Sequence, residues 1–188
     1  MSRRRAVFLD RDGTLIEDVG YLNRADQLRV LPGVPAALRD LRAAGFLLIV
    51  VTNQSAVARG WLTEPKLCAI NQRLNAMLRA EGAGLDAFYC CPHLPDGTVR
   101  RYTHECECRK PRPGLLLKAA DEWGIDLERS YAVGDSERDV VAGNRTGCHT
   151  ILIAEGSTGL PDSAADECAA DLAEAAHLIL RREGREFD

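Results

Sequence analysis

The sequence has few aromatic residues and no long hydrophobic run, and these absences exclude several classes of protein. Aromatic residues make up 5% of the 188 residues, and no extended stretch combines them with basic residues. Together with a formal net charge of −4, this disfavours a nucleic-acid-binding surface. The longest apolar stretch, 46–51, is too short to span a membrane, and no secretory signal is visible. We expect a cytoplasmic protein that binds neither nucleic acid nor membrane.

The chain also lacks internal repeats, low-complexity tracts and an interdomain linker. Its length fits one domain, and a hydrophobic content of 46% suffices for a core. We therefore expect a single domain over residues 1–188. A monomer is expected from the size and from the absence of an obvious association helix.

Short aliphatic strands alternate with helical segments, as in parallel βαβ units. The expected strands are 6–9, 46–51, 88–90, 131–133 and 150–153. The expected helices follow Gly33, Thr63 and Pro113, and two more cover 139–146 and 172–182; residues 162–170 are expected to form a loop or a loose helix start. This order predicts an α/β fold with a Rossmann-like parallel sheet and helices on both faces.

Two carboxylates, Asp10 and Asp12, follow the first expected strand directly, and Gly13 permits a sharp turn after them. Ligands of open α/β sheets bind at the carboxyl ends of strands. There, Asp10 could attack a phosphorus atom while Asp12 transfers the proton of the leaving group, with a divalent cation between them. The alternative is a solvated turn that uses Asp for local hydrogen bonds.

Polar residues also follow the other strands. Thr52 could bind phosphoryl oxygens, and Lys110 could neutralise both Asp10 and a phosphoryl group. Arg109 could grip a second anionic group. Asp135, after the strand 131–133, could coordinate the same cation as Asp10, and Mg²⁺ fits this ligand chemistry best. Asp139 could support Lys110 or cap the following helix.

Seven cysteines, an odd number, favour reduced thiols or metal ligation over a disulfide framework. One group surrounds a loop at about 90–110 and contains Cys91, His93, Cys106 and Cys108. Three cysteines and a histidine make a closed, structural Zn²⁺ site. Cys90 and His104 compete as ligands, and free thiols are the alternative. The other cysteines, Cys68, Cys148 and Cys168, are expected to pack as small apolar residues.

Together these motifs resemble the haloacid dehalogenase (HAD) superfamily of aspartate-nucleophile phosphatases. Its four motifs occur in order at Asp10-x-Asp12-Gly13-Thr14, Thr52, Lys110 and Gly134-Asp135. More narrowly, residues 6–153 are similar to the D-glycero-D-manno-heptose 1,7-bisphosphate 7-phosphatase family. The stretches that carry this similarity are 7–14, 52–55, 58–60, 91–93 and 106–111.

The resemblance implies a Mg²⁺-dependent phosphatase that removes the 7-phosphate of this sugar bisphosphate through an aspartyl-phosphate. Asp10 would be the nucleophile. Asp12 would be the acid/base and also bind Mg²⁺ through its backbone carbonyl, while Asp135 would be the remaining protein ligand. Thr52 and Lys110 would stabilise the phosphoryl group.

The resemblance further implies two sets of binding residues. Substrate contacts would come from Asp18, Val19, Gly20, Tyr21, Asn53, Gln54, Ser55 and Arg109. The zinc ligands would be Cys91, His93, Cys106 and Cys108, which sets Cys90 aside.

Alternatives remain at this stage. A histidinol-phosphate phosphatase shares the zinc loop and the catalytic motifs, although Ala58-Arg59-Gly60 favours the heptose family. A noncatalytic, zinc-stabilised phosphate-binding module is a different class of function. Two departures from the family pattern are Ala56-Val57 and Ser136, and the second places serine where several members carry lysine.

Overall fold

The computed structural model describes residues 3–154 and 163–185 and contains one six-stranded sheet whose neighbouring strands all pair in parallel. The strand order is β3-β2-β1-β4-β5-β6. The strands are β1 (Ala6–Leu9), β2 (Leu47–Asn53), β3 (Ala87–Cys91), β4 (Tyr131–Gly134), β5 (His149–Ile153) and β6 (Glu167–Ala169). The chain builds outward from β1 in one direction and then crosses to β4 on its other side. The carboxyl ends of β1 and β4 therefore form the topological switch point of the sheet.

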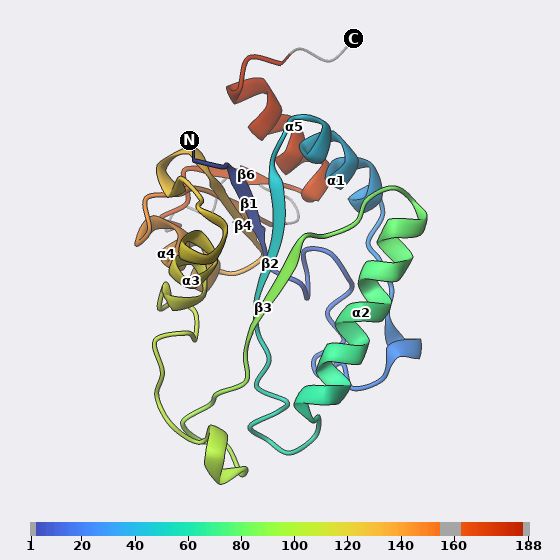
Figure 1. The fold of residues 1–188 in the computed structure, drawn as a ribbon, viewed down its shortest axis with the longest axis vertical. Helices are drawn as coiled ribbons and strands as arrows, with labels where there is room; N and C mark the ends of the chain where they lie inside the picture. The colour runs from blue at the N-terminus through green and yellow to red at the C-terminus, as the bar shows by residue number, and fades with distance from the viewer. Residues whose placement is uncertain (1–2, 155–162, 186–188) are drawn as a thin grey trace.

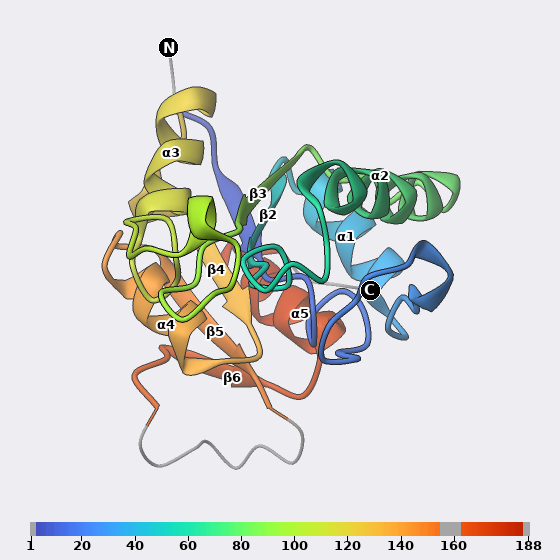
Figure 2. The ribbon, with the colours of Figure 1, turned by 90° about the horizontal axis from the view of Figure 1, so that it is seen from below.

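Within the described residues, five α-helices cover both faces of this sheet (Figures 1 and 2). They are α1 (Val34–Ala43), α2 (Glu64–Ala80), α3 (Gly114–Trp123), α4 (Glu137–Asn144) and α5 (Leu172–Arg182). Alternation along β1 sends Val7 and Leu9 into a core with α1, α2 and α5, and Ala6 and Phe8 into a second core with α3 and α4. This arrangement confirms the predicted α/β fold with helices on both faces.

The start of α2 follows the expected capping chemistry, whereas α4 begins two residues earlier than expected. The Thr63 hydroxyl accepts a hydrogen bond from the Lys66 backbone N–H at 3.4 Å, which confirms the predicted start of α2. The helix expected over 139–146 instead begins at Glu137. The reason is that the Asp139 carboxylate accepts a hydrogen bond from the Ser136 backbone N–H at 3.1 Å, so that Asp139 lies inside the first turn.

A loop or loose helix start was expected over 162–170, but residues 167–169 form the strand β6, so this expectation was wrong for them. Residue 162 lies outside the described residues. This strand has three residues, too few for an alternating pattern to mark it. It pairs with β5, and Asp166 supports the junction by accepting hydrogen bonds from the Thr150 N–H at 2.8 Å and hydroxyl at 2.9 Å. Three short 3₁₀ helices, Ala25–Gln27, Arg100–Tyr102 and Leu127–Arg129, were not predicted either.

None of the helices in the described part of the chain has the length and apolar character needed to cross a membrane.

Candidate active site

The predicted catalytic residues meet in one cleft at the carboxyl ends of β1, β2 and β4. Asp10 follows β1 and donates its backbone N–H to the Val133 carbonyl of β4 at 2.9 Å. The residues that line the cleft are Asp10, Asp12, Asp18, Gly20, Tyr21, Thr52, Asn53, Ser55, Lys110, Asp135 and Arg138. Parallel strands that end at the same edge thus bring together motifs separated by more than a hundred residues.

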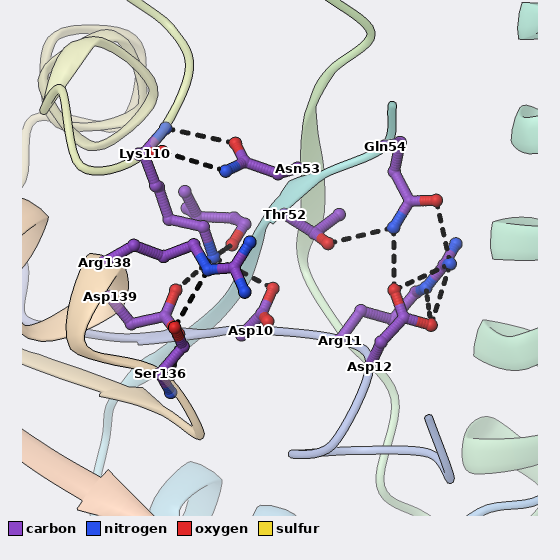
Figure 3. Close-up of polar contacts among 11 residues, drawn as sticks. Asp10, Arg11, Asp12, Thr52, Asn53, Gln54, Lys110, Ser136, Arg138 and Asp139 are labelled. Atoms are coloured by element: carbon purple, nitrogen blue, oxygen red, sulfur yellow. Dashed lines mark hydrogen bonds and ion pairs between the residues drawn. The ribbon is translucent and has the colours of Figure 1, made fainter. Parts of the chain in front are cut away.

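Lys110 holds the Asp10 carboxylate in place (Figure 3). Its buried ammonium lies 2.9 Å from Asp10 Oδ1 and 2.5 Å from Asp139 Oδ1, and it donates to the Val51 carbonyl at 2.6 Å. Burial alone would lower the pKa of Lys110, but the two carboxylates outweigh burial and raise it. Lys110 is therefore a fixed cation beside Asp10, and Asp139 supports it as the sequence suggested.

Asn53, a predicted substrate contact, fixes the backbone of Lys110. Its side-chain amide donates to the Lys110 carbonyl at 3.0 Å and accepts from the Lys110 N–H at 3.0 Å. Asn53 also lines the cleft, where it could reach a substrate, and this contact stays a prediction. The paired hydrogen bonds place the loop before α3 against the end of β2.

The Asp12 carboxylate belongs to a network centred on Arg11, which sequence reasoning missed (Figure 3). Arg11 is 1% exposed. Its guanidinium donates to Asp12 Oδ2 at 2.9 Å, Gln54 Oε1 at 2.9 Å and Asn71 Oδ1 at 3.0 Å. Gln54 in turn donates to Asp12 at 2.8 Å and to the Thr52 hydroxyl at 3.0 Å. No sequence signal marks Arg11, because an arginine after a strand is ordinarily solvated.

Replacing Arg11 with methionine should destabilise the protein by about 3 kcal/mol, because it leaves the acceptors on Asp12, Gln54 and Asn71 without their buried partner. Urea denaturation would measure the free energy of unfolding. The matched control is Arg24→Met, which removes an exposed pair with Asp26 and should change stability by less than about 1 kcal/mol. Equal stability of both variants would show that the Arg11 network contributes nothing.

The predicted substrate loop 18–21 contributes Asp18, Gly20 and Tyr21 to the lining of the cleft. Asp18 closes a local turn by accepting the Gly20 N–H at 2.7 Å, and Tyr21 packs edge-on against Trp61 with ring centroids 4.4 Å apart. The Arg59 guanidinium contacts both rings. Of the predicted substrate residues, Val19, Gln54 and Arg109 do not line the cleft, and their direct contact with substrate stays a prediction.

Three carboxylates could hold a cation beside the nucleophile. One oxygen each of Asp10, Asp135 and Asp139 lies within 4.8 Å of the others. Gly13 allows the chain to approach Asp135 closely, because a Cβ there would lie 2.1 Å from Asp135 Oδ2 and its φ is +78°. Hard carboxylate oxygens fit Mg²⁺. Asp139 is buried, and its two oxygens accept from Lys110 and from the Ser136 N–H, whereas Lys110 contacts Asp10 at one oxygen, Oδ1. Asp10 and Asp135 are therefore the side-chain ligands that fit best.

The Asp135 carboxylate should make Mg²⁺ binding depend on pH. Desolvation, and then the charges of Asp10 and Asp139, raise its pKa to about 6. A proton competes with the cation, so apparent affinity should fall about tenfold per pH unit below that value. Titration calorimetry with Mg²⁺ between about pH 5 and pH 8 would measure this. Asp135→Asn should bind weakly at every pH, whereas a wild-type affinity independent of pH would contradict the expectation.

The loop between β3 and α3 brings the predicted zinc ligands together. Cys108 Sγ lies 3.2 Å from the sulfurs of both Cys91 and Cys106, which are 3.5 Å apart. His93 Nδ1 lies 3.2 Å from Cys108 Sγ and 3.7 Å from Cys91 Sγ. A tetrahedral zinc site places its sulfurs about 3.8 Å apart, close to these distances. Burial, and then the neighbouring His104, lower the pKa of His93, which favours the neutral imidazole that metal binding requires.

The competing ligands lie outside this group. Cys90 precedes Cys91 on β3 and points to the opposite face, where its sulfur accepts a hydrogen bond from Asn71 at 3.4 Å. His104 is exposed and packs against the His93 ring. Of the cysteines expected to pack as apolar residues, Cys148 is buried and Cys168 is half-buried, but Cys68 is exposed on α2. The expectation was therefore wrong for Cys68.

The loop also connects the cysteine group to the basic residues of the cleft. Arg109 follows Cys108 directly and donates to the His93 carbonyl at 3.1 Å. It lines a second cavity next to the cleft, with Arg112 and Arg145. The position of Arg109, and of Lys110 after it, thus depends on the shape of the cysteine loop.

Comparison with known proteins agrees with this geometry. The HAD-hydrolase-like family model matches residues 107–176. The chain is 43% identical to D-glycero-beta-D-manno-heptose-1,7-bisphosphate 7-phosphatase of Yersinia pestis over 88% of this chain and 87% of that protein. It is 42% identical to the Escherichia coli K12 protein of the same name over 88% of this chain and 86% of that protein.

Solved structures share the fold. The D,D-heptose 1,7-bisphosphate phosphatase of B. bronchiseptica, complexed with magnesium and phosphate, superposes with a TM-score of 0.81 at 33% identity, covering 95% of this chain and 99% of that one. An HAD-like phosphatase from Mesorhizobium loti gives a TM-score of 0.85 at 30% identity, and the match covers 99% of this chain and 90% of that one. The chain therefore belongs to the D-glycero-D-manno-heptose 1,7-bisphosphate 7-phosphatase family of the HAD superfamily.

Proposed function

We propose that the protein is a Mg²⁺-dependent phosphatase that removes the 7-phosphate of D-glycero-D-manno-heptose 1,7-bisphosphate. The observation that carries this proposal is the Asp10 carboxylate, held 2.9 Å from Lys110 in a cleft that also contains Asp12, Thr52 and Asp135. The names of the relatives specify the β anomer, and we propose the same anomer here.

In the first step, an Asp10 oxygen bonds to phosphorus, and the bond from phosphorus to the sugar oxygen breaks. Asp12 gives that oxygen a proton, so an alcohol leaves and an aspartyl-phosphate remains. In the second step, Asp12 takes a proton from water, whose oxygen attacks phosphorus and releases Asp10 and inorganic phosphate. Lys110 and the Thr52 hydroxyl stabilise the phosphoryl oxygens in both steps.

Asp10, Asp135 and the backbone carbonyl of Asp12 would hold Mg²⁺. When bound, the ion screens the charge of the phosphoryl group and of the carboxylates around it. Asp10 and Asp135 provide the oxygen ligands that this ion prefers, and the proximity of their like charges favours a bound cation.

Zinc bound by Cys91, His93, Cys106 and Cys108 would have a structural role, since four protein ligands leave no position for water. Their mutual contacts of 3.2–3.7 Å support this assignment. The ligands must remain reduced, which fits a cytoplasmic location. We further propose that residues 1–188 act as a single domain and as a monomer, which light scattering would test.

The identity of the product tests the proposed reaction. ³¹P NMR of heptose 1,7-bisphosphate after treatment with enzyme and Mg²⁺ should show inorganic phosphate and a sugar that retains its 1-phosphate. Retention of the 7-phosphate, or of both phosphates, would contradict the proposed function.

A further inference from the structure

Arg138 brings a second cation into the active-site cleft. It lies in the first turn of α4 and lines the cleft with Asp10, Lys110 and Asp135. Its Nε donates to the Ser136 hydroxyl at 2.9 Å, and Figure 3 shows the side chain directed toward the region of Asp10 and Lys110. A short polar residue at position 136 therefore acts as an anchor for the arginine side chain.

Three other cations near the cleft, Lys110, Arg11 and Arg109, have partners within the protein, and Arg59 lies over the rings of Tyr21 and Trp61. Lys110 is buried between Asp10 and Asp139. Arg11 is buried behind Asp12, and Arg109 donates to the His93 carbonyl and does not line the cleft. The Nε–H of Arg138 is used by Ser136, while its two terminal nitrogens extend beyond that contact and its side chain is exposed.

A bisphosphate presents an electrostatic difficulty in this cleft. The lining contains four carboxylates, on Asp10, Asp12, Asp18 and Asp135. The cation and Lys110 offset the charge of the phosphate being cleaved. The second phosphate would be repelled by these carboxylates unless another cation binds it. The terminal nitrogens of a guanidinium match two phosphate oxygens and can form paired, charge-assisted hydrogen bonds.

We propose that Arg138 binds the phosphate that is not cleaved and so makes the enzyme prefer a bisphosphate over a monophosphate. This inference rests on the proposed function. Ser136 is a positioning residue, since its hydroxyl orients the guanidinium without touching the substrate. Arg138 is a specificity residue, and the bond-making steps at Asp10 do not require it.

The test compares steady-state kinetics on heptose 1,7-bisphosphate and on the same heptose carrying only the 7-phosphate, at saturating Mg²⁺. Arg138→Ala should raise KM for the bisphosphate on the order of ten- to hundredfold, with a much smaller change in kcat. The KM for the monophosphate should change little, so the preference between the substrates should collapse. Arg138→Lys should retain part of the preference, and Ser136→Ala should lose part of it.

Arg129→Ala is the matched control, because it removes the same charge from an exposed residue just before β4, at the opposite end of the strand. It should leave both substrates unaffected. Equal losses on both substrates in Arg138→Ala, or an unchanged KM for the bisphosphate, would overturn the inference alone. A wild-type enzyme unable to cleave the bisphosphate would overturn the proposed function as well.

Discussion

Replacing Asp10 with asparagine should lower kcat on the order of 10⁴-fold or more, because a neutral amide cannot form the acyl-phosphate bond. The fold should persist. Asparagine has the same shape, its oxygen can still accept from Lys110, and Asp139 remains as the charged partner of that lysine. Phosphate release at matched metal content measures the effect, and circular dichroism checks the fold.

The control for this variant is Asp121→Asn, which neutralises an exposed carboxylate on α3 outside the cleft and should leave kcat unchanged. Acid quenching during turnover should also trap phosphate on the peptide that contains Asp10 in the wild type but not in Asp10→Asn. Activity of Asp10→Asn near that of the wild type would rule out the covalent mechanism.

Replacing Cys108 with serine should weaken zinc binding and open the loop between β3 and α3. Cys108 contacts the three other proposed ligands, and Arg109 and Lys110 follow it in the chain. Loss of the metal should therefore disturb the cleft and reduce kcat/KM on the order of tenfold or more. Zinc content, limited proteolysis within the loop and kinetics should change together.

Cys90→Ser is the matched control, because Cys90 adjoins the proposed ligand Cys91 but points to the opposite face of β3. It should retain zinc, resistance to proteolysis and activity. If Cys90→Ser lost zinc and Cys108→Ser kept it, the ligand assignment would be wrong. Verified zinc loss without any change in the loop or the kinetics would exclude a supporting role for the metal.

Most of the candidate site could be predicted from the sequence because its residues lie at the ends of buried strands or directly after them. The ends of β1, β2 and β4 are marked by Asp10, Thr52 and Asp135, and parallel pairing brings these ends to one edge. Cys91 and His93 lie close in the chain to their partners Cys106 and Cys108, so the cluster was visible as a local group.

What could not be predicted depends on tertiary contacts. The burial of Arg11 requires Asn71, sixty residues away on α2, and nothing near Arg11 in the sequence indicates that partner. Likewise, the sequence does not indicate whether Asn53 binds substrate or another part of the protein. The fold brings the Lys110 backbone carbonyl and N–H within 3.0 Å of the Asn53 side chain. The strand β6 forms because its backbone pairs with the edge strand β5, whereas its own three residues are too few to show a periodic pattern.

The central claim is that this cleft acts on a heptose bisphosphate, and a comparison of kcat/KM tests it most directly. The substrates are the β anomer of heptose 1,7-bisphosphate and histidinol phosphate, each assayed with the same enzyme at saturating Mg²⁺. The account predicts a preference for the bisphosphate on the order of a hundredfold or more. A preference for histidinol phosphate would contradict the proposed substrate while leaving the phosphatase chemistry in place.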